Sequence, residues 1–150
     1  MKRILFVCHG NICRSPMAEF VMKNLVDRHD RGGEFSIDSA GTSREEVGNP
    51  VYPPAARELR LNGLEPGSKT ARQLRPEDYQ EYDVLVGMDE ANVQNMLRLY
   101  HGDPDNKIVR LLNLTQKPRD IADPWYSGDF TQTWRDVNQG CVALLNWLDR

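Results

Sequence analysis

A cysteine and an arginine separated by five residues are the side chains in this sequence that point most directly to chemistry. Cys8 and Arg14 lie in the segment 7–16, VCHGNICRSP, which follows an apolar run. A loop between a strand and a helix start directs backbone N–H groups and the positive end of the helix dipole at one point, which favours an anion. Arg14 can hold two phosphate oxygens through its planar guanidinium, and the same field favours the thiolate form of Cys8. The spacing therefore predicts a phosphate cradle with a sulfur nucleophile at its floor.

The residues within and after this loop refine the interpretation. Gly10 and Asn11 suit tight backbone turns, and the Gly-Lys-Ser/Thr ending of nucleotide-binding loops is missing. Ser15 is expected to donate a hydrogen bond to the sulfur of Cys8 and to help it leave. Ser15 and Pro16 are also typical of a helix start, with the hydroxyl as the cap and proline at the first helical position.

Transfer of a phosphoryl group from an ester also needs an acid, because the leaving oxygen must be protonated as its bond breaks. The histidines are poorly placed for this. His29 ends a predicted helix, His101 lies on a polar turn, and His9 is expected to tune the field of the loop. A carboxylate on a loop at the same sheet edge as Cys8 fits better. Three aspartates meet this condition: Asp103, Asp120 and Asp123. The residues alone do not choose among them.

Short apolar runs alternate with helical patterns along the chain. Strands are expected at 2–7, 35–41, 83–88 and 106–112. Helices are expected from residue 15 and over 55–63, 75–82, 90–100 and 133–149, with loops at 42–54 and 116–130. Asp89 is a predicted cap for the helix that follows it. This alternation predicts a parallel sheet with helices on both faces, whose ligands lie outside the carboxyl ends of the strands.

Length and composition bound the class of protein. A chain of 150 residues predicts one domain, and its net charge of -3 with scattered basic residues argues against a nucleic-acid binder. Three cysteines cannot form a disulfide framework, and the dispersed histidines provide no metal site. No long apolar stretch predicts a membrane span, and the first apolar run is too short for a signal peptide, so we expect a cytoplasmic protein.

The segment VCHGNICRSPMAE resembles, nearly residue for residue, the signature of the low-molecular-weight protein tyrosine phosphatases. Other segments resemble landmarks of that family in the expected order: DSAGT (38–42), ARQL (71–74), YDVLVGMDEAN (82–92) and DPWY (123–126). The resemblance implies an α/β three-layer sandwich with a four-stranded parallel sheet in the order 2-1-3-4, flavodoxin-like or phosphotyrosine phosphatase I-like. It implies a single low-molecular-weight phosphatase domain over residues 1–150. It also implies hydrolysis of phosphotyrosine esters through a phosphocysteine intermediate, without a metal or other cofactor.

The resemblance assigns roles to particular residues. Cys8 would be the nucleophile, Arg14 would hold the phosphate and the transition state, and Asp123 would be the general acid. Asp123 would then act as the base for the water that hydrolyses phosphocysteine. Asn11 would hold the loop in a strained shape through a hydrogen bond with Ser39.

The resemblance also implies a substrate-binding surface. Its members would be His9, Gly10, Asn11, Ile12, Cys13, Ser15, Trp125 and Tyr126. The rings of Trp125 and Tyr126 either line a slot for a phenyl ring or simply pack the loop. Cys13 either forms a reversible disulfide with Cys8 or packs in the loop. The implied partners are phosphotyrosine-containing proteins or peptides and inorganic phosphate as product, with no nucleic acid or membrane, and the implied state is a monomer or weak dimer.

Two segments depart from the family pattern. The family often has an aromatic residue, followed shortly by a histidine, after AGT. Here the segment 43–54 has Arg44, Glu45 and Glu46, and Tyr52 is its only aromatic residue. One wall of the substrate slot is therefore missing, charged or rebuilt by Tyr52. Lys69 and Thr70 stand where the family often has a histidine. Substrate preference stays open on these grounds.

Three other functions deserve comparison. An arsenate reductase of this fold would need relay cysteines near the third strand and its helix, and residues 84–96 have none. A protein arginine phosphatase would resemble this chain except that threonine usually occupies the position of Ile12, which suits an aryl ring better. A non-catalytic phosphoprotein-binding module or phosphocysteine carrier would not need Arg14 and Asp123 together.

Overall fold

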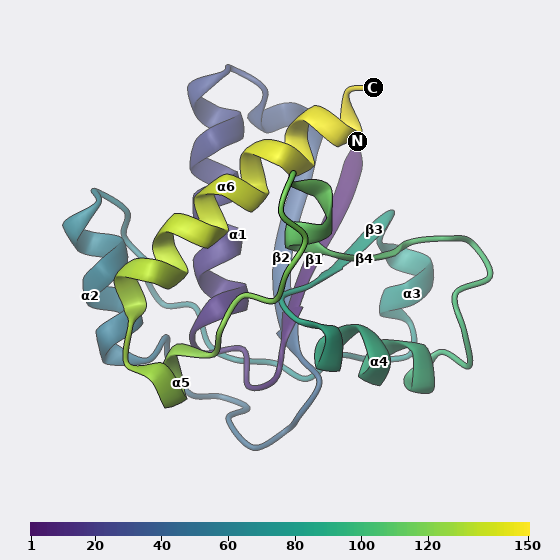
Figure 1. Ribbon diagram of the computed structural model, residues 1–150, viewed down its shortest axis with the longest axis horizontal. Helices are drawn as coiled ribbons and strands as arrows, with labels where there is room; N and C mark the ends of the chain where they lie inside the picture. Colours follow the sequence, from purple (N-terminus) through teal and green to yellow (C-terminus); the bar gives the residue numbers. More distant parts are fainter.

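The computed structural model describes all residues from 1 to 150 and contains one parallel four-stranded sheet in the order β2-β1-β3-β4 (Figure 1). The strands are β1 (Lys2–Cys8), β2 (Phe35–Gly41), β3 (Val84–Gly87) and β4 (Ile108–Arg110). The predicted α/β fold and strand order are thus confirmed. In the register of the sheet, Cys8 pairs with Gly41 and Val7 with Gly87, so three strands end at one edge.

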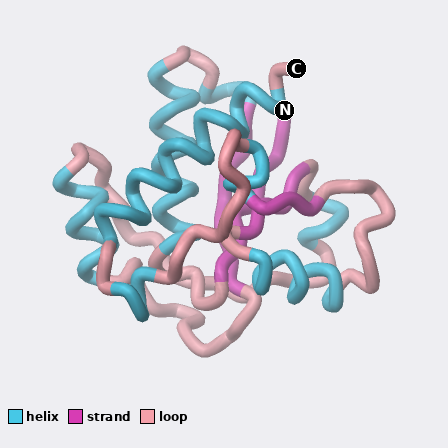
Figure 2. Tube along the Cα trace, viewed as in Figure 1, coloured by secondary structure: helices cyan, strands magenta, loops and turns pink.

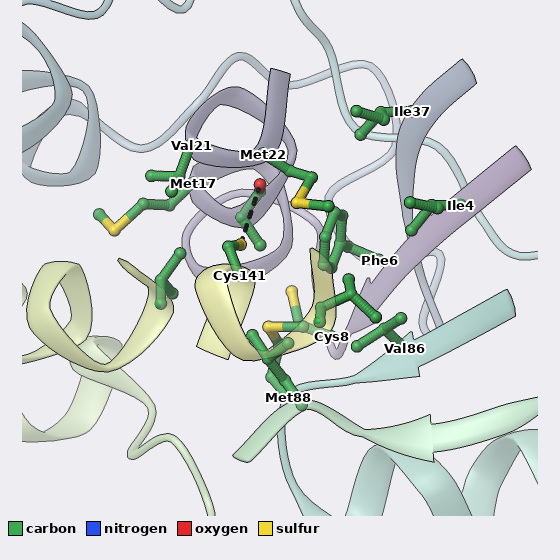
Figure 3. Close-up of a cluster of buried hydrophobic side chains, with 14 of the residues drawn as sticks. Ile4, Phe6, Cys8, Met17, Val21, Met22, Ile37, Val86, Met88 and Cys141 are labelled. Carbon is green, nitrogen blue, oxygen red and sulfur yellow. Dashed lines mark hydrogen bonds between the residues drawn. The ribbon is translucent and has the colours of Figure 1, made fainter. Parts of the chain in front are cut away.

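Helices cover both faces of this sheet (Figures 1 and 2). They are α1 (Arg14–Arg28), α2 (Pro53–Leu61), α3 (Asp78–Glu81), α4 (Glu90–Leu99), α5 (Pro124–Ser127) and α6 (Phe130–Leu148), with short 3-10 turns η1 (Gly32–Glu34) and η2 (Leu111–Leu114). Side chains alternate between the faces of β1. Ile4 and Phe6 join the larger core with α1 and α6 (Figure 3), and Leu5 and Val7 join the smaller core with α3 and α4.

Some element boundaries differ from the sequence prediction for local reasons. The strand expected at 106–112 is shorter because the chain turns into η2 directly after Arg110. The loop expected at 116–130 contains α5, which starts with Asp123 as its cap and Pro124 at its first position. This Asp-Pro pair is a local helix-start signal within a segment whose other residues favour a loop.

The start of α1 also corrects a prediction. The helix begins at Arg14, so Ser15 is its second residue and Pro16 its third, and no side chain caps it. Proline is tolerated there because the first N–H groups of a helix have no partner within the helix. The Ser15 hydroxyl instead contacts the loop before the helix. None of the helices combines the length and apolar character needed to span a membrane.

Candidate active site

The sulfur of Cys8 lies at the end of β1, and the loop that follows folds back over it. Cys8 is buried, and its Sγ lies 2.9 Å from Ser15 Oγ. The backbone N–H of Asn11 also donates to Sγ, at 3.3 Å. The sulfur therefore lies at the amino end of α1 among hydrogen-bond donors. This environment suits an anion placed above the sulfur.

Asn11 holds this loop from inside. Its backbone adopts the left-handed conformation, with φ of 60°, and its side chain is buried. Asn11 Oδ1 accepts from the backbone N–H of Arg72, at 3.1 Å, which orients the amide. Asn11 Nδ2 then donates to Ser15 Oγ at 2.8 Å and to Ser39 Oγ at 2.9 Å. The contact expected between Asn11 and Ser39 is present.

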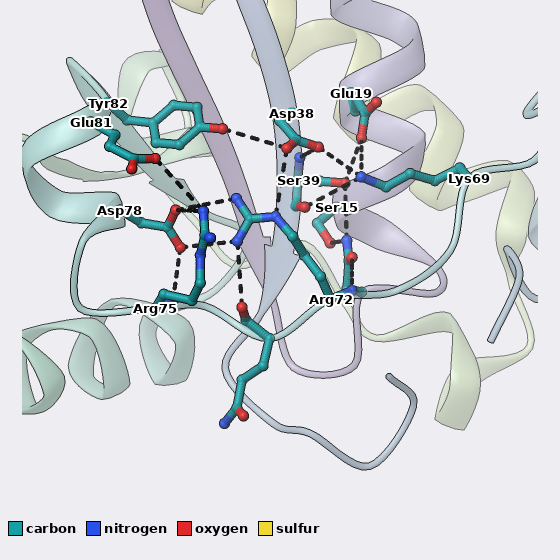
Figure 4. Close-up of polar contacts among 12 residues, drawn as sticks. Ser15, Glu19, Asp38, Ser39, Lys69, Arg72, Arg75, Asp78, Glu81 and Tyr82 are labelled. Carbon is teal, nitrogen blue, oxygen red and sulfur yellow. Dashed lines mark hydrogen bonds and ion pairs between the residues drawn. The ribbon is translucent and has the colours of Figure 1, made fainter. Parts of the chain in front are cut away.

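The direction of these hydrogen bonds follows from a buried carboxylate. Ser39 donates its only proton to Glu19, at 2.6 Å, so it accepts from Asn11. Ser15 also accepts from Asn11, which leaves its own proton for the sulfur of Cys8. Glu19 is buried and pairs with Lys69, whose Nζ lies 3.0 Å from Glu19 Oε1 (Figure 4). The Ser15 hydroxyl therefore donates a hydrogen bond to the sulfur of Cys8 rather than accepting one.

Arg14 is fixed before any substrate arrives. Its Nη1 donates to Asp89 Oδ2 at 2.6 Å and to the carbonyl oxygen of Ile121 at 2.9 Å. Burial lowers the pKa of Arg14, but the charges of Cys8 and Asp89 outweigh burial and raise its pKa above the ordinary value. The guanidinium therefore remains a cation in the loop.

The structure separates the three candidate acids. Asp123 lines the pocket above Cys8, and its Oδ2 lies 3.6 Å from Arg14 Nη2. Asp120 instead pairs with Arg110, at 2.7 Å, and is half exposed. Asp103 accepts from the hydroxyl of Tyr79 at 2.6 Å on the other side of the sheet. Only Asp123 of the three reaches the pocket.

The pocket is a slot of about 150 Å³ that opens above the sulfur. Most of the predicted binding residues line it, together with two glutamates: Cys8, His9, Gly10, Ile12, Cys13, Arg14, Glu45, Glu46, Asp123, Trp125 and Tyr126. Asn11 and Ser15 lie behind the loop and act on its shape rather than on the slot wall. Trp125 and Tyr126 are exposed, at 52% and 86%, although they belong to a helix that packs on the protein. Their exposure favours a binding surface over simple loop packing.

The 43–52 segment supplies a charged wall, one of the three alternatives left open by the sequence. Glu45 and Glu46 line the slot, whereas Tyr52 does not. Tyr52 packs behind Trp125, with ring centroids 4.8 Å apart. It therefore supports the aromatic side of the slot.

The other two cysteines lie in apolar surroundings. Burial, with the nearby charge of Cys8, raises the pKa of Cys13 to about 12, so this thiol is protonated at neutral pH. Cys13 nevertheless lines the same slot as Cys8. Cys141 is fully buried in the core between α6 and α1 (Figure 3), and burial raises its pKa as well. No cysteine other than Cys13 lies beside Cys8, so the relay of an arsenate reductase is missing.

Sequence reasoning missed three contributors to this site. Asp89 was predicted to cap the helix after it and to lie at the same sheet edge as Cys8, but its contact with Arg14 was not predicted. It does cap α4, and its second oxygen fixes Arg14. Its place at the end of β3, on the ligand-binding edge, was the available signal. Glu19 and Lys69 gave no signal, because a charged residue in a helix or loop is usually solvated.

Comparisons with known proteins agree with this geometry. A family model described as low molecular weight phosphotyrosine protein phosphatase matches residues 3–150. The human low molecular weight phosphotyrosine protein phosphatase is 38% identical over an alignment of 149 residues, which covers 96% of this chain and 94% of the human protein. The low molecular weight protein-tyrosine-phosphatase YfkJ of Bacillus subtilis is 33% identical over an alignment of 147 residues, which covers 97% of this chain and 94% of YfkJ.

Solved structures give the same result. The crystal structure of YfkJ from Bacillus subtilis matches with a TM-score of 0.96 at 32% identity, covering 99% of this chain and 95% of that chain. The structure of a Drosophila arginine phosphatase matches with a TM-score of 0.88 at 28% identity, covering 100% of this chain and 99% of that chain.

Proposed function

Because this chain belongs to the low molecular weight phosphotyrosine protein phosphatase family, we propose that its Cys8, Arg14 and Asp123 carry out the cysteine-based hydrolysis of phosphotyrosine esters known for that family. The observation that carries the assignment is the convergence of these three side chains in one slot, at the carboxyl edge of the sheet. We also propose that residues 1–150 act as one phosphatase domain, since one chain supplies every residue of this site.

The first step is an in-line displacement at phosphorus. The Cys8 thiolate forms an S–P bond as the P–O bond to the tyrosine ring breaks. Asp123, as the protonated acid, gives its proton to the departing phenolate oxygen, which otherwise leaves poorly. Arg14 and the loop N–H groups hold the equatorial phosphate oxygens, where negative charge is spread in the transition state.

The second step removes the phosphoryl group from sulfur. Asp123, now ionised, takes a proton from a water molecule as the water oxygen attacks phosphorus. The S–P bond breaks, and inorganic phosphate and the Cys8 thiolate are released. Ser15 donates its hydrogen bond to the departing sulfur, at the 2.9 Å separation found here.

The slot favours an aryl group over the guanidino group of phosphoarginine. Ile12, within the loop, lines the slot with an apolar side chain, and Trp125 and Tyr126 present exposed rings. A phenyl ring bound there contacts apolar and aromatic surface. The activity named for the Drosophila arginine phosphatase is therefore not the one proposed here.

The direct test compares variants on aryl phosphates in excess EDTA. Cys8→Ser should abolish turnover of p-nitrophenyl phosphate, because no thiolate remains to accept the phosphoryl group. Asp123→Asn should slow turnover of phenyl phosphate by about 10²- to 10⁴-fold and that of p-nitrophenyl phosphate by less, because nitrophenolate leaves without a proton.

Asp120→Asn is the matched control for the acid. It makes the same substitution three positions away, on a carboxylate that pairs with Arg110 outside the slot, and should leave both rates near wild type. Equal sensitivity of the two substrates to Asp123→Asn would remove Asp123 from the role of acid. Turnover by Cys8→Ser would overturn the whole assignment.

A further inference from the structure

We propose that Glu45 and Glu46 make this enzyme select phosphotyrosine sites flanked by basic residues, an inference that rests on the proposed function of the slot. Both carboxylates line the slot that holds Cys8, Arg14 and the exposed rings of α5. A peptide whose phosphotyrosine reaches Cys8 must therefore pass its neighbouring residues over this acidic wall.

The backbone holds the two glutamates in place. The segment 43–52 is tied to the catalytic loop at both ends, by Ser43 N–H to the carbonyl oxygen of His9 at 3.0 Å and by Tyr52 N–H to that of Ile12 at 2.9 Å. Between these ties, turn hydrogen bonds close the segment, such as Asn49 N–H to the carbonyl oxygen of Glu46 at 2.9 Å. The wall is thus a fixed extension of the catalytic loop.

Glu46 lies directly against that loop. A Cβ atom built on Gly10 would lie 3.3 Å from Glu46 Cγ, and Glu46 Oε2 accepts from Asn49 Nδ2 at 2.7 Å. Glu45 is more exposed, with 71% of its side chain accessible. Glu46 therefore lies against the edge of the catalytic loop, and Glu45 extends into the solvent beside it.

The charge of this wall is not compensated within the protein. No lysine or arginine forms an ion pair with Glu45 or Glu46. The titratable groups beside them are His9, whose Nε2 lies 3.4 Å from Glu45, and Cys13, whose pKa is raised by burial and in part by the charge of Glu46. Arg44, next in the chain, is exposed and does not line the slot. By contrast, Asp123 in the same slot pairs with Arg14.

A basic residue of the peptide substrate can provide the positive charge that the protein itself does not place against Glu45 and Glu46. A lysine or arginine beside the phosphotyrosine would pair with the wall, whereas an aspartate or glutamate would face like charge. An exposed ion pair changes binding by up to about fivefold. Two carboxylates therefore predict about a 2- to 25-fold preference in kcat/KM for an arginine-flanked peptide over a glutamine-flanked one, and a penalty for a glutamate-flanked one.

The experiment measures phosphate release from three phosphotyrosine peptides of equal length, flanked by arginine, glutamine or glutamate on both sides. Wild type is compared with the double variant Glu45→Gln and Glu46→Gln, which keeps side-chain size and an acceptor for Asn49. Glu77→Gln is the matched control, because Glu77 is an exposed carboxylate without an ion pair, outside the slot, at the start of α3.

The expected result is a ranking of arginine over glutamine over glutamate for wild type and Glu77→Gln, and ratios near one for the double variant. Raising the salt concentration to 0.5 M, where the Debye length falls to about 4 Å, should shrink the preference. Glu45→Arg is a second, single variant at the exposed position, and it should weaken or invert the ranking.

Two results would overturn the inference: wild type that does not prefer the arginine-flanked peptide, or a preference that persists in both the double variant and Glu45→Arg. p-Nitrophenyl phosphate separates this failure from failure of the proposed function. If reduced wild type hydrolyses p-nitrophenyl phosphate but does not discriminate among the peptides, the phosphatase assignment stands and the acidic wall has no part in selection.

Discussion

Asn11 performs two tasks that substitutions can separate. Its φ of 60° suits glycine or asparagine, and its amide joins Ser15, Ser39 and the backbone of Arg72. Asparagine meets both requirements, since its short polar side chain tolerates the left-handed region. Asn11 therefore holds the loop both through its left-handed backbone conformation and through the hydrogen bonds of its side chain.

We predict that Asn11→Ala and Asn11→Gly both reduce kcat by more than tenfold, because the Ser15 hydroxyl loses the partner that directs its proton to Cys8. Asn11→Gly should be more stable than Asn11→Ala by about 1 kcal/mol, because glycine accepts the positive φ. Steady-state kinetics and urea unfolding of both variants test this. Full recovery of kcat in Asn11→Gly would assign Asn11 a backbone role alone.

At the scale of elements, the carboxyl ends of β1 and β2 approach more closely than a side chain allows. A Cβ on Gly41 would lie 2.7 Å from the carbonyl oxygen of His9 and 3.1 Å from the carbonyl carbon of Gly10. Both atoms belong to the backbone of the catalytic loop, which cannot rotate away as a side chain can. Gly41 therefore sets how closely the loop packs on the second strand.

Gly41→Ala should lower kcat/KM by about 10- to 100-fold, because it displaces the loop that positions sulfur and phosphate. Gly33→Ala is the matched control: its Cβ would meet nothing within 4 Å and its φ is not in the left-handed region. It should keep wild-type kinetics. If Gly41→Ala also kept wild-type kcat/KM, the loop would be shown to tolerate the shift.

The sequence predicts the elements of this fold better than it predicts the polar contacts between them. Apolar runs and alternating residues located the four strands, and the Cys8–Arg14 spacing located the cradle, because these signals are local. The contact between Arg14 and Asp89 joins residues 75 positions apart and depends on how β1 and β3 pack. The network of Glu19 and Lys69 likewise arises only when α1 packs beside β2. Distant polar contacts leave no periodicity in a sequence.

At the scale of the molecule, one carboxylate links the outer strand to the segment before β3. Asp38 on β2 pairs with Lys69 at 2.7 Å and with Arg72 at 3.5 Å (Figure 4). Burial raises the pKa of Asp38, but the hydrogen bond and charge of Lys69 outweigh burial and hold its pKa below the ordinary value. Asp38 therefore binds a proton more readily in the unfolded chain than in the folded protein.

This difference contributes to acid sensitivity. Since the folded pKa is lowered, the stabilisation is present above the unfolded pKa of about 3.9 and is lost as the pH falls through the folded pKa. Asp38→Asn should lower the free energy of unfolding at pH 7 and flatten its fall between pH 5 and pH 3. Urea unfolding at several pH values tests this.

Asp30→Asn serves as the control, because Asp30 is exposed and its side chain forms no ion pair. It should follow the wild-type pH profile. If the free energy of unfolding falls with pH as steeply in Asp38→Asn as in wild type, Asp38 is not a source of the acid sensitivity.

The position of Trp125 gives the molecule an intrinsic optical probe. Of the three tryptophans, Trp125 alone lines the slot, while Trp134 and Trp147 lie half-buried on α6 outside it. A phosphopeptide that enters the slot changes the solvent around one indole and leaves the other two unaffected. Its fluorescence therefore reports occupancy directly, so that affinity can be followed in Cys8→Ser, where no product forms.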